Sequence, residues 1–384
     1  MLTEQQALEM KLTPDDFKHV DIYSRNRLDQ ISGKSNGYLV SVLKRFAKNK
    51  WALFFFIILL IIVLLAIIVP YASPYSAYDP ISTNSFATSL RPRWPGGLIN
   101  GYYQTLMSPT YYDQMKEVSG FIIGTPKMVE NGDYLVTINP YALPELKNIY
   151  PIFGTDARGV DIWTKTWQAA AISLQVAVVV AIVSVILGAI YGAISGACAG
   201  TKYDTVDTVM MRIVEILSGV PTILWLLILS SIIVIGNNAA GTVDNNTLLV
   251  SLICIIWMGP AITTRTYILK TKDAEYIQAV RTLGGSQPRI IFIHMLPNIS
   301  GRLLVRFVNI IPAIIFYEST LVFLGIKSKF DLGIGTLIDE GYQVSEYITP
   351  LLAPSLVLVL LTLSSQIVAN GINDAIDPRV SAGK

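Results

Sequence analysis

Six long stretches of apolar residues, each with at most two charged side chains, constrain this chain more than any other feature. The first begins at Trp51, and no charged residue occurs between Lys50 and Asp79. The other five lie at 166–201, 213–236, 247–264, 303–325 and 350–372. A helix needs about 20 apolar residues to cross the hydrocarbon core of a membrane. The sequence therefore predicts an all-α polytopic membrane protein with six transmembrane helices in contact with lipid.

The composition agrees with a membrane protein. Hydrophobic residues make up 52% of the chain and charged residues 15%, against about 25% charged residues in soluble domains. A net charge of +2 gives no reason to expect nucleic acid as a partner. The stretch from Trp51 lacks a small-residue cleavage site, so it is expected to span the membrane and not to be a signal peptide. Cys198 and Cys254 both lie in apolar stretches, and buried thiols are expected in place of a disulfide.

The distribution of lysine and arginine predicts the orientation in the membrane. The N-terminal segment 1–50 and the loop 265–302 are rich in both residues, whereas the short loop 237–246 has neither. Both termini and the loop 265–302 are therefore predicted to be cytoplasmic. Lys327 and Lys329 fall on the outer side in this arrangement, which departs from the positive-inside rule.

The loop 71–166 is predicted to form a small extracellular insertion of strands and loops. It is too long for the positive-inside rule to apply, and it is rich in tyrosine, proline and glycine. Residues 127–137 place Asn131–Gly132, the preferred pair of a type I′ turn, between two strand-like runs. The tyrosines suit a docking surface for a partner. A surface elaboration without a ligand is the alternative that the sequence leaves open.

The hydrophilic run 272–297 predicts two short helices between two spans. Gly284 and Gly285 can take positive φ and end the first helix. Ser286 offers an N-cap for the second, and Pro288 suits its first turn. The apolar side of the first helix is expected to comprise Tyr276, Ala279, Val280 and Leu283. Such a compact unit at the end of two membrane helices is placed to transmit a push to them.

The same run resembles the cytoplasmic EAA loop of ABC-importer permeases, whose pattern is E-A-A, three residues, Gly, nine residues and I-x-L-P. The matching residues are Ala279, Gly284, Leu296 and Pro297, and the departures are Gln278, Val280 and His294. Two further motifs, FGTDARGVDIW at 153–163 and ANGINDAIDPR at 369–379, are similar to those of the oligopeptide, dipeptide and nickel branch. The likeness covers most of residues 40–380 and is strongest to the C-type subunits of oligopeptide permeases.

This resemblance implies a division of the chain and a set of partners. The implied parts are a cytoplasmic segment 1–50, a first helix 51–70, the insertion 71–166, a five-helix permease core 167–373 with a coupling loop 266–300, and a cytoplasmic tail 374–384. A multi-pass subunit of the bacterial plasma membrane would take up peptides with a second homologous permease, two ATP-binding subunits and an extracellular substrate-binding lipoprotein. It would bind no cofactor directly and catalyse nothing, because its partners would hydrolyse the ATP.

Contact with the ATP-binding subunits is expected from the first helix of the coupling loop. The residues expected there are Glu275, Tyr276, Gln278, Ala279, Arg281, Leu283 and Gly284. Tyr276 and Leu283 would be the apolar anchors, and Glu275, Gln278 and Arg281 the polar contacts. The dipeptide and nickel importers of the same branch remain alternatives, since they share these motifs.

Small and polar residues within the spans suggest two further roles. The glycines that recur every fourth residue, Gly188, Gly192, Gly196 and Gly200, form a stripe that allows another helix to pack closely. That helix could belong to the same subunit, which we favour, or to a partner. Glu318, Asn309 and Gln366 form a candidate translocation path, because polar groups in a membrane are costly. In the alternative, Glu318 and Glu215 pair with Arg265, Arg306 or a partner subunit.

Two other classes of protein lack the features they would need. A self-sufficient secondary transporter would need an inverted repeat and an ion site, and no second copy of the run 272–297 is found. A membrane enzyme or receptor would need a catalytic cluster or a ligand domain. The glycine-rich 196–203 lacks the spacing of a phosphate loop, and His19 and His294 are the only histidines.

Overall fold

The computed structural model describes residues 38–236, 243–327, 331–344 and 347–376. The chain divides into two compact units, Met1–Lys44 and Arg45–Lys384. Helix α3 (Tyr38–Lys48) begins in the first unit, and all that follows concerns the second. Most of the predicted segment 1–50 and of the tail 374–384 lies outside the described residues.

Five helical runs within the described ranges are long and apolar enough to cross a membrane. They are α4 (Lys50–Ala72), α6 (Ile162–Cys198), α9–α10 (Asn245–Ile256 and Met258–Thr271), α12–η4–α13 (Gln287–Arg289, Ile290–Met295 and Leu296–Phe323) and α15 (Thr349–Ile376). A sixth candidate is the bent pair α7–α8. If that pair counts as one span, the described chain has the six spans predicted from the sequence.

The predicted third span, 213–236, is broken. The two helices of the pair are α7 (Asp204–Ser218) and α8 (Thr222–Gly236). They are bent by 89° at the break, whereas the apolar length predicted one continuous span. Pro221 has no N–H to continue the helix and disfavours helical backbone at Val220. The Trp225 Nε1–H donates to the Leu217 carbonyl at 2.8 Å, which satisfies one of the acceptors freed at the end of α7.

The fifth span begins earlier than the predicted 303–325. One helical run starts at Gln287 and continues through the π-helical segment η4 to Phe323. Ser286 precedes it with extended backbone, and Pro288 occupies its first turn. The predicted second helix of the hydrophilic run is therefore the beginning of the fifth span, so that the loop and the span share one helix.

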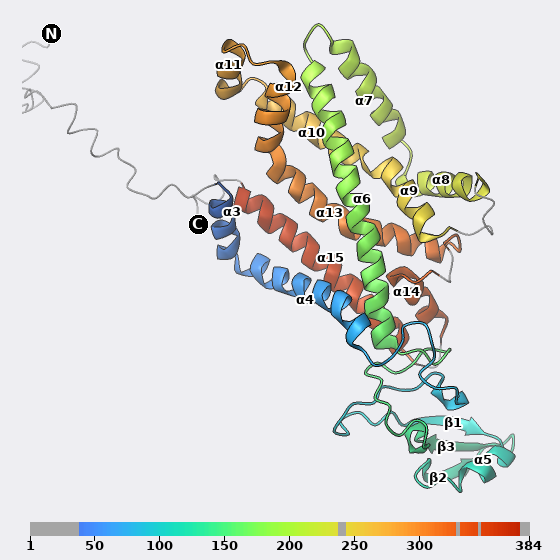
Figure 1. Ribbon diagram of the computed structural model, residues 1–384. Helices are drawn as coiled ribbons and strands as arrows, with labels where there is room; N and C mark the ends of the chain where they lie inside the picture. The colour runs from blue at the N-terminus through green and yellow to red at the C-terminus, as the bar shows by residue number, and fades with distance from the viewer. Residues whose placement is uncertain (1–37, 237–242, 328–330, 345–346, 377–384) are drawn as a thin grey trace, which may run out of the picture. The chain divides into compact units, whose positions relative to one another are not determined.

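Helix α6 is central to the second unit, where it packs against α10, α13 and α4 (Figure 1). The structure places α10 against the glycine stripe. A Cβ atom at Gly188 would lie 2.5 Å from the Trp257 carbonyl oxygen, and one at Gly192 would overlap the Ala261 carbonyl. A Cβ at Gly196 would lie 2.8 Å from Cγ2 of Ile268. The fourth glycine, Gly200, follows the end of α6 at a φ of +63°.

The insertion 71–166 folds around its own core and contains a small antiparallel sheet, as predicted. Its strands are β1 (Tyr103–Met107), β2 (Ile122–Met128) and β3 (Tyr134–Ile138), in the order β1-β3-β2. Its short helices are η2 (Ser85–Ala87), α5 (Pro109–Met115) and η3 (Pro140–Ala142). Phe121, Ile138 and Leu146 are fully buried in this core. The sheet lies at the opposite end of α6 from α11 (Glu275–Thr282) (Figure 1).

The predicted β2–β3 hairpin is present, but its turn is not type I′. That turn needs positive φ at both central residues, and of Asn131 and Gly132 only Gly132 has it, at +89°. The Gly132 N–H donates to the Val129 carbonyl at 2.9 Å, and the Val129 N–H donates to the Asp133 carbonyl at 2.8 Å. The Asn131 side chain accepts a hydrogen bond from the Asp133 N–H at 3.2 Å, which favours this longer loop.

The two cysteines are free thiols, as predicted, but they are not both buried. Cys198 is half-buried at the end of α6, and Cys254 is exposed on α9. An apolar stretch indicates that a residue lies in a span, but it does not show whether the side chain faces the interior of the helix bundle or its outer surface.

Candidate functional site

The turn between α11 and α12 depends on two glycines for different reasons. Gly284 has a φ of +82°, and a Cβ atom there would meet nothing within 4 Å. Glycine is therefore needed at 284 for its backbone angle. At Gly285 a Cβ would lie 2.7 Å from Cγ1 of Val280, and the Gly285 N–H donates to the Val280 carbonyl at 3.0 Å. Glycine is needed at 285 because the chain passes close to the end of α11.

Helix α11 is anchored by a residue that the predicted apolar face omitted. Ile277 is fully buried and packs with Ile268 of α10, with Ile290 and with Ile299, in a cluster that also includes Val280 at its edge. The predicted face was wrong in part, because Tyr276, Ala279 and Leu283 are exposed. Periodicity alone could not choose between two overlapping apolar faces on an eight-residue helix.

All seven residues expected to contact the ATP-binding subunits are exposed: Glu275, Tyr276, Gln278, Ala279, Arg281, Leu283 and Gly284. Leu283 is 87% exposed at the tip of the turn, and Tyr276 is 42% exposed. The Asn298 Nδ2 group donates to the Tyr276 hydroxyl at 2.8 Å and holds the ring. An exposed leucine beside a held aromatic ring is a surface that a partner could cover.

Charged side chains tie the coupling loop to the helix bundle. Arg265 of α10 donates from Nε and Nη2 to the two carboxylate oxygens of Asp207 on α7, at 2.7 and 2.6 Å. Ser195 of α6 donates to the same carboxylate. Beyond α10, the Lys272 ammonium donates to the Ala199 carbonyl at the end of α6. Three helices therefore meet at the base of the loop, and none of these contacts was predicted.

The candidate translocation residues do not all lie together. Asn309 and Gln366 line one groove of about 530 Å³ between α13 and α15. Glu318 is 2% exposed and pairs with Lys327, which is also buried. The alternative pairing with Arg265 or Arg306 is therefore wrong for Glu318, and it is also wrong for Glu215, which pairs with Arg212 at 3.0 Å. In the predicted orientation, the buried partner Glu318 would account for the position of Lys327 on the outer side.

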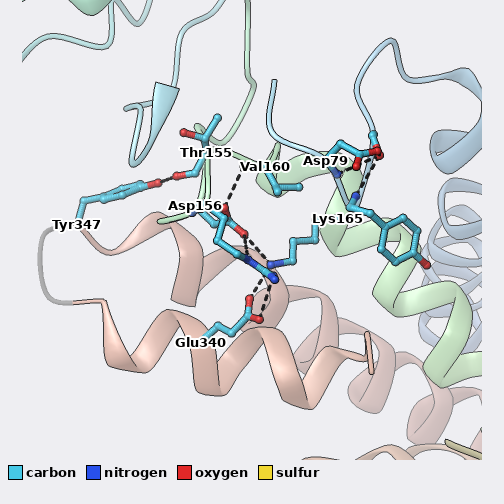
Figure 2. Close-up of polar contacts among 10 residues, drawn as sticks. Asp79, Thr155, Asp156, Val160, Lys165, Glu340 and Tyr347 are labelled. Atoms are coloured by element: carbon cyan, nitrogen blue, oxygen red, sulfur yellow. Dashed lines mark hydrogen bonds and ion pairs between the residues drawn. The ribbon is translucent and has the colours of Figure 1, made fainter. Parts of the chain in front are cut away.

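An ion cluster that the sequence did not reveal lies where the insertion meets α6 and α14 (Ile334–Gln343). The Lys165 ammonium, on a side chain only 3% exposed, lies 2.6 Å from the carboxylates of both Asp156 and Glu340. Figure 2 shows Lys165 between them. Arg158 reaches Glu340 at 3.3 Å. Glu340 is far from Lys165 in the sequence, so that no local pattern could reveal their contact.

The FGTDARGVDIW motif holds this junction together. The Thr155 hydroxyl is buried, donates to the Ala87 carbonyl at 2.6 Å and accepts from the Leu90 N–H at 2.8 Å. The Tyr347 hydroxyl donates to the Thr155 carbonyl (Figure 2). Asp161 caps α6 by accepting from the Thr164 N–H at 2.8 Å. Burial raises the pKa of the Asp161 carboxyl, and the hydrogen bonds from Thr164 oppose that rise.

Comparison with known proteins identifies the family. Residues 192–382 match the family described as binding-protein-dependent transport system inner membrane component. Residues 37–92 match the N-terminal TM domain of oligopeptide transport permease C. The chain is 48% identical over 372 residues to the oligopeptide transport system permease protein OppC of Mycoplasma pneumoniae, which covers 95% of this chain and 96% of that protein. The chain belongs to the OppC family of transport permeases.

Other members of this branch are similar over nearly the same length. The OppC protein of Mycoplasma genitalium is 46% identical over 376 residues, 96% of this chain and 97% of that protein. The dipeptide transport system permease protein DppC of Lactococcus lactis is 29% identical over 371 residues, 95% and 98% of the two chains. The resemblance predicted from the three motifs is confirmed. An OppC-family permease is a non-catalytic membrane subunit, which decides against the secondary transporter and the membrane enzyme considered above.

Replacing Lys165 with methionine should destabilise the protein by about 1–3 kcal/mol, because two partly buried carboxylates would face each other unpaired. Chemical denaturation of the purified protein in detergent or lipid measures this change. Arg158→Ala is the matched control: its side chain is 62% exposed, and its loss should cost less than about 1 kcal/mol. Adding Glu340→Gln to the Lys165 variant should recover part of the loss. Equal stability of the Lys165 and Arg158 variants would contradict the buried role of this cluster.

Proposed function

We propose that this chain forms one half of a membrane path through which a bacterium imports peptides, with ATP hydrolysed in separate subunits. The near-full-length similarity to oligopeptide permeases carries this proposal. A second homologous permease would supply the other half, two ATP-binding subunits would dock on the coupling loop, and an extracellular lipoprotein would deliver the peptide. Dipeptides are a second candidate cargo, because a dipeptide permease is similar over nearly the whole chain.

The exposed residues of α11 and the continuity of the α12–η4–α13 run support a mechanism for coupling. An ATP-binding subunit that covers Tyr276 and Leu283 would displace α11, which rests on Ile290 at the start of that run through Ile277. The turn at Gly284 fixes the angle between α11 and the run. A movement of the partner would therefore reach α13 through one continuous helical run.

Replacing Gly284 with valine should uncouple ATP hydrolysis from transport. A β-branched residue at positive φ is strained by about 1–3 kcal/mol, so α11 would change its angle. We expect normal insertion into the membrane but peptide uptake reduced about tenfold or more in the reconstituted complex. Gly284→Asn is the control, because asparagine tolerates this backbone region and should retain most uptake. Wild-type uptake by the valine variant would show that the turn transmits no movement.

The proposed orientation places both termini and the coupling loop in the cytoplasm and the insertion outside. A thiol-reactive, membrane-impermeant reagent should label a cysteine introduced at Asn131 in intact cells, in a chain lacking Cys198 and Cys254. A cysteine introduced at Ser286 should be labelled only after the membrane is opened. Asn131 and Ser286 are exposed, so that accessibility reports the side of the membrane. The reverse labelling pattern would overturn the orientation.

The insertion is proposed to dock the substrate-binding lipoprotein, because it would lie on the side where the peptide arrives. Leu98 is 82% exposed and Met128 is 69% exposed, and both lie outside the core of the insertion. Replacing both with serine should leave the thermal unfolding of the subunit unchanged. It should weaken binding of the loaded lipoprotein by about 1–2 kcal/mol. The stimulation of ATPase activity by a subsaturating concentration of that lipoprotein should therefore fall several-fold. Lys116→Ser, also on the insertion surface, is the control. Unchanged stimulation would favour a surface elaboration without a partner.

A further inference from the structure

Arg306 is a cation in the fifth span for which the described part of the chain provides no anion. The other charged side chains near it in sequence or space are satisfied: Glu318 pairs with Lys327, and Arg265 pairs with Asp207. Arg302, one turn earlier on α13, donates to Asn373 of α15. None of the ion pairs formed among residues 38–236, 243–327, 331–344 and 347–376 includes Arg306. Charged residues within spans are rare and generally serve a function.

The guanidinium of Arg306 rests in a seat made by a glycine of α10. A Cβ atom at Gly259 would overlap Nη2 of Arg306 and would lie 3.1 Å from its Cζ. Any other residue at 259 would therefore displace the charged group. The Arg306 side chain is exposed, and it lines a cavity of about 270 Å³ between α13, α10 and the α7–α8 break. The missing side chain at Gly259 thus leaves room for the guanidinium of Arg306 at the edge of the cavity.

Asn309 adds an unsatisfied acceptor on the same face of α13. It lies three residues after Arg306, the spacing that brings helix side chains together. Its Oδ1 atom is buried and has no hydrogen-bond partner in the described chain. Asn309 also lines the larger groove that continues between α13 and α15 to Gln366. The two cavities share Asn309, Ala313 and Tyr317, so they follow one face of α13.

We propose that Arg306, seated on Gly259, binds the terminal carboxylate of a peptide as it passes along α13. This inference rests on the proposed function and names a residue that would select its cargo. An arginine can hold a carboxylate through two parallel hydrogen bonds, and the free Asn309 oxygen can accept a backbone N–H of the same peptide. The groove beyond Asn309 has a mostly apolar lining that includes Phe316 and Leu363, which suits side chains of varied type.

A carboxylate supplied permanently by the partner permease is the competing explanation. The geometry favours a transient ligand, because the space next to the guanidinium opens into a groove that continues along the helix. A partner carboxylate paired with Arg306 would occupy only the cavity of about 270 Å³ and would leave the groove from Asn309 to Gln366 unused. A lipid phosphate could also meet an arginine, but it would not distinguish a peptide acid from a peptide amide.

The test compares uptake of one labelled peptide and of its C-terminal amide by the complete complex in liposomes, with the binding lipoprotein present. For each peptide the rate with a variant is divided by the rate with wild type, so that any preference of the lipoprotein cancels. Arg306→Gln should lower this ratio about tenfold or more for the free acid and less than about twofold for the amide. Gly259→Ala keeps the charge but removes its seat, and it should cause the same selective loss. Arg306→Lys should recover part of the uptake of the acid.

The control is Arg212→Gln, which removes an exposed cation paired with Glu215 and should affect neither peptide. Equal loss of both peptides with Arg306→Gln would overturn the assignment. In that case, dissociation of the complex in size-exclusion chromatography would assign Arg306 to the partner permease, and an intact complex would assign it to lipid or to folding. Failure of the wild-type complex to import either peptide would instead overturn the proposed function, and this inference with it.

Discussion

The close approach of α6 and α10 is the contact on which the positions of the other functional elements depend. Gly188 and Gly192 of α6 bring its backbone against the carbonyls of Trp257 and Ala261, and Gly196 lies against the side chain of Ile268. In a membrane, where apolar side chains gain little by leaving lipid, such backbone contact supplies much of the packing energy. Helix α10 continues into the coupling loop and carries both Arg265 and the seat of Arg306. A larger residue in the glycine stripe would therefore displace the coupling loop, the ion pair of Arg265 with Asp207 on α7, and the cavity beside Arg306 together.

Helix α6 also joins the two ends of the protein. It has 37 residues and is thus about 55 Å long, more than the thickness of the hydrocarbon core. At its beginning, Asp161 and Lys165 fix the insertion and α14 through hydrogen bonds and ion pairs. At its other end, the Ala199 carbonyl accepts from Lys272 beside the coupling loop. The single helix α6 thus sets the distance between the insertion, where cargo would arrive, and the coupling loop, where force would enter.

The sequence predicted those features that depend on local composition and spacing. The long apolar stretches with few charges located the spans, and the glycine at 284 marked the turn, because both follow from the properties of neighbouring residues. The 89° break at Pro221 could not be derived from apolar length, since a proline shows where a helix can be interrupted but not the direction in which the chain continues. The Lys165–Glu340 pair joins α6 to α14, which are far apart in the sequence, so only the packing of α14 brings it together. The Glu318–Lys327 pair forms across the turn that follows α13. Ile277 was missed because a short helix has several apolar faces, and the surrounding helices decide which one is buried.

The π-helical segment Ile290–Met295 has a consequence for how the fifth span can move. A π segment accommodates one residue more than the α-helix on either side of it. If the segment tightened to an α-helix, everything beyond it would turn by about 100° and advance by about 1.5 Å. The contacts of α13 with α6, α15 and α14 would have to rearrange for this to happen. A small displacement of α11 could thus become a rotation of α13 about its axis, which would turn Arg306 and Asn309 toward the groove or away from it.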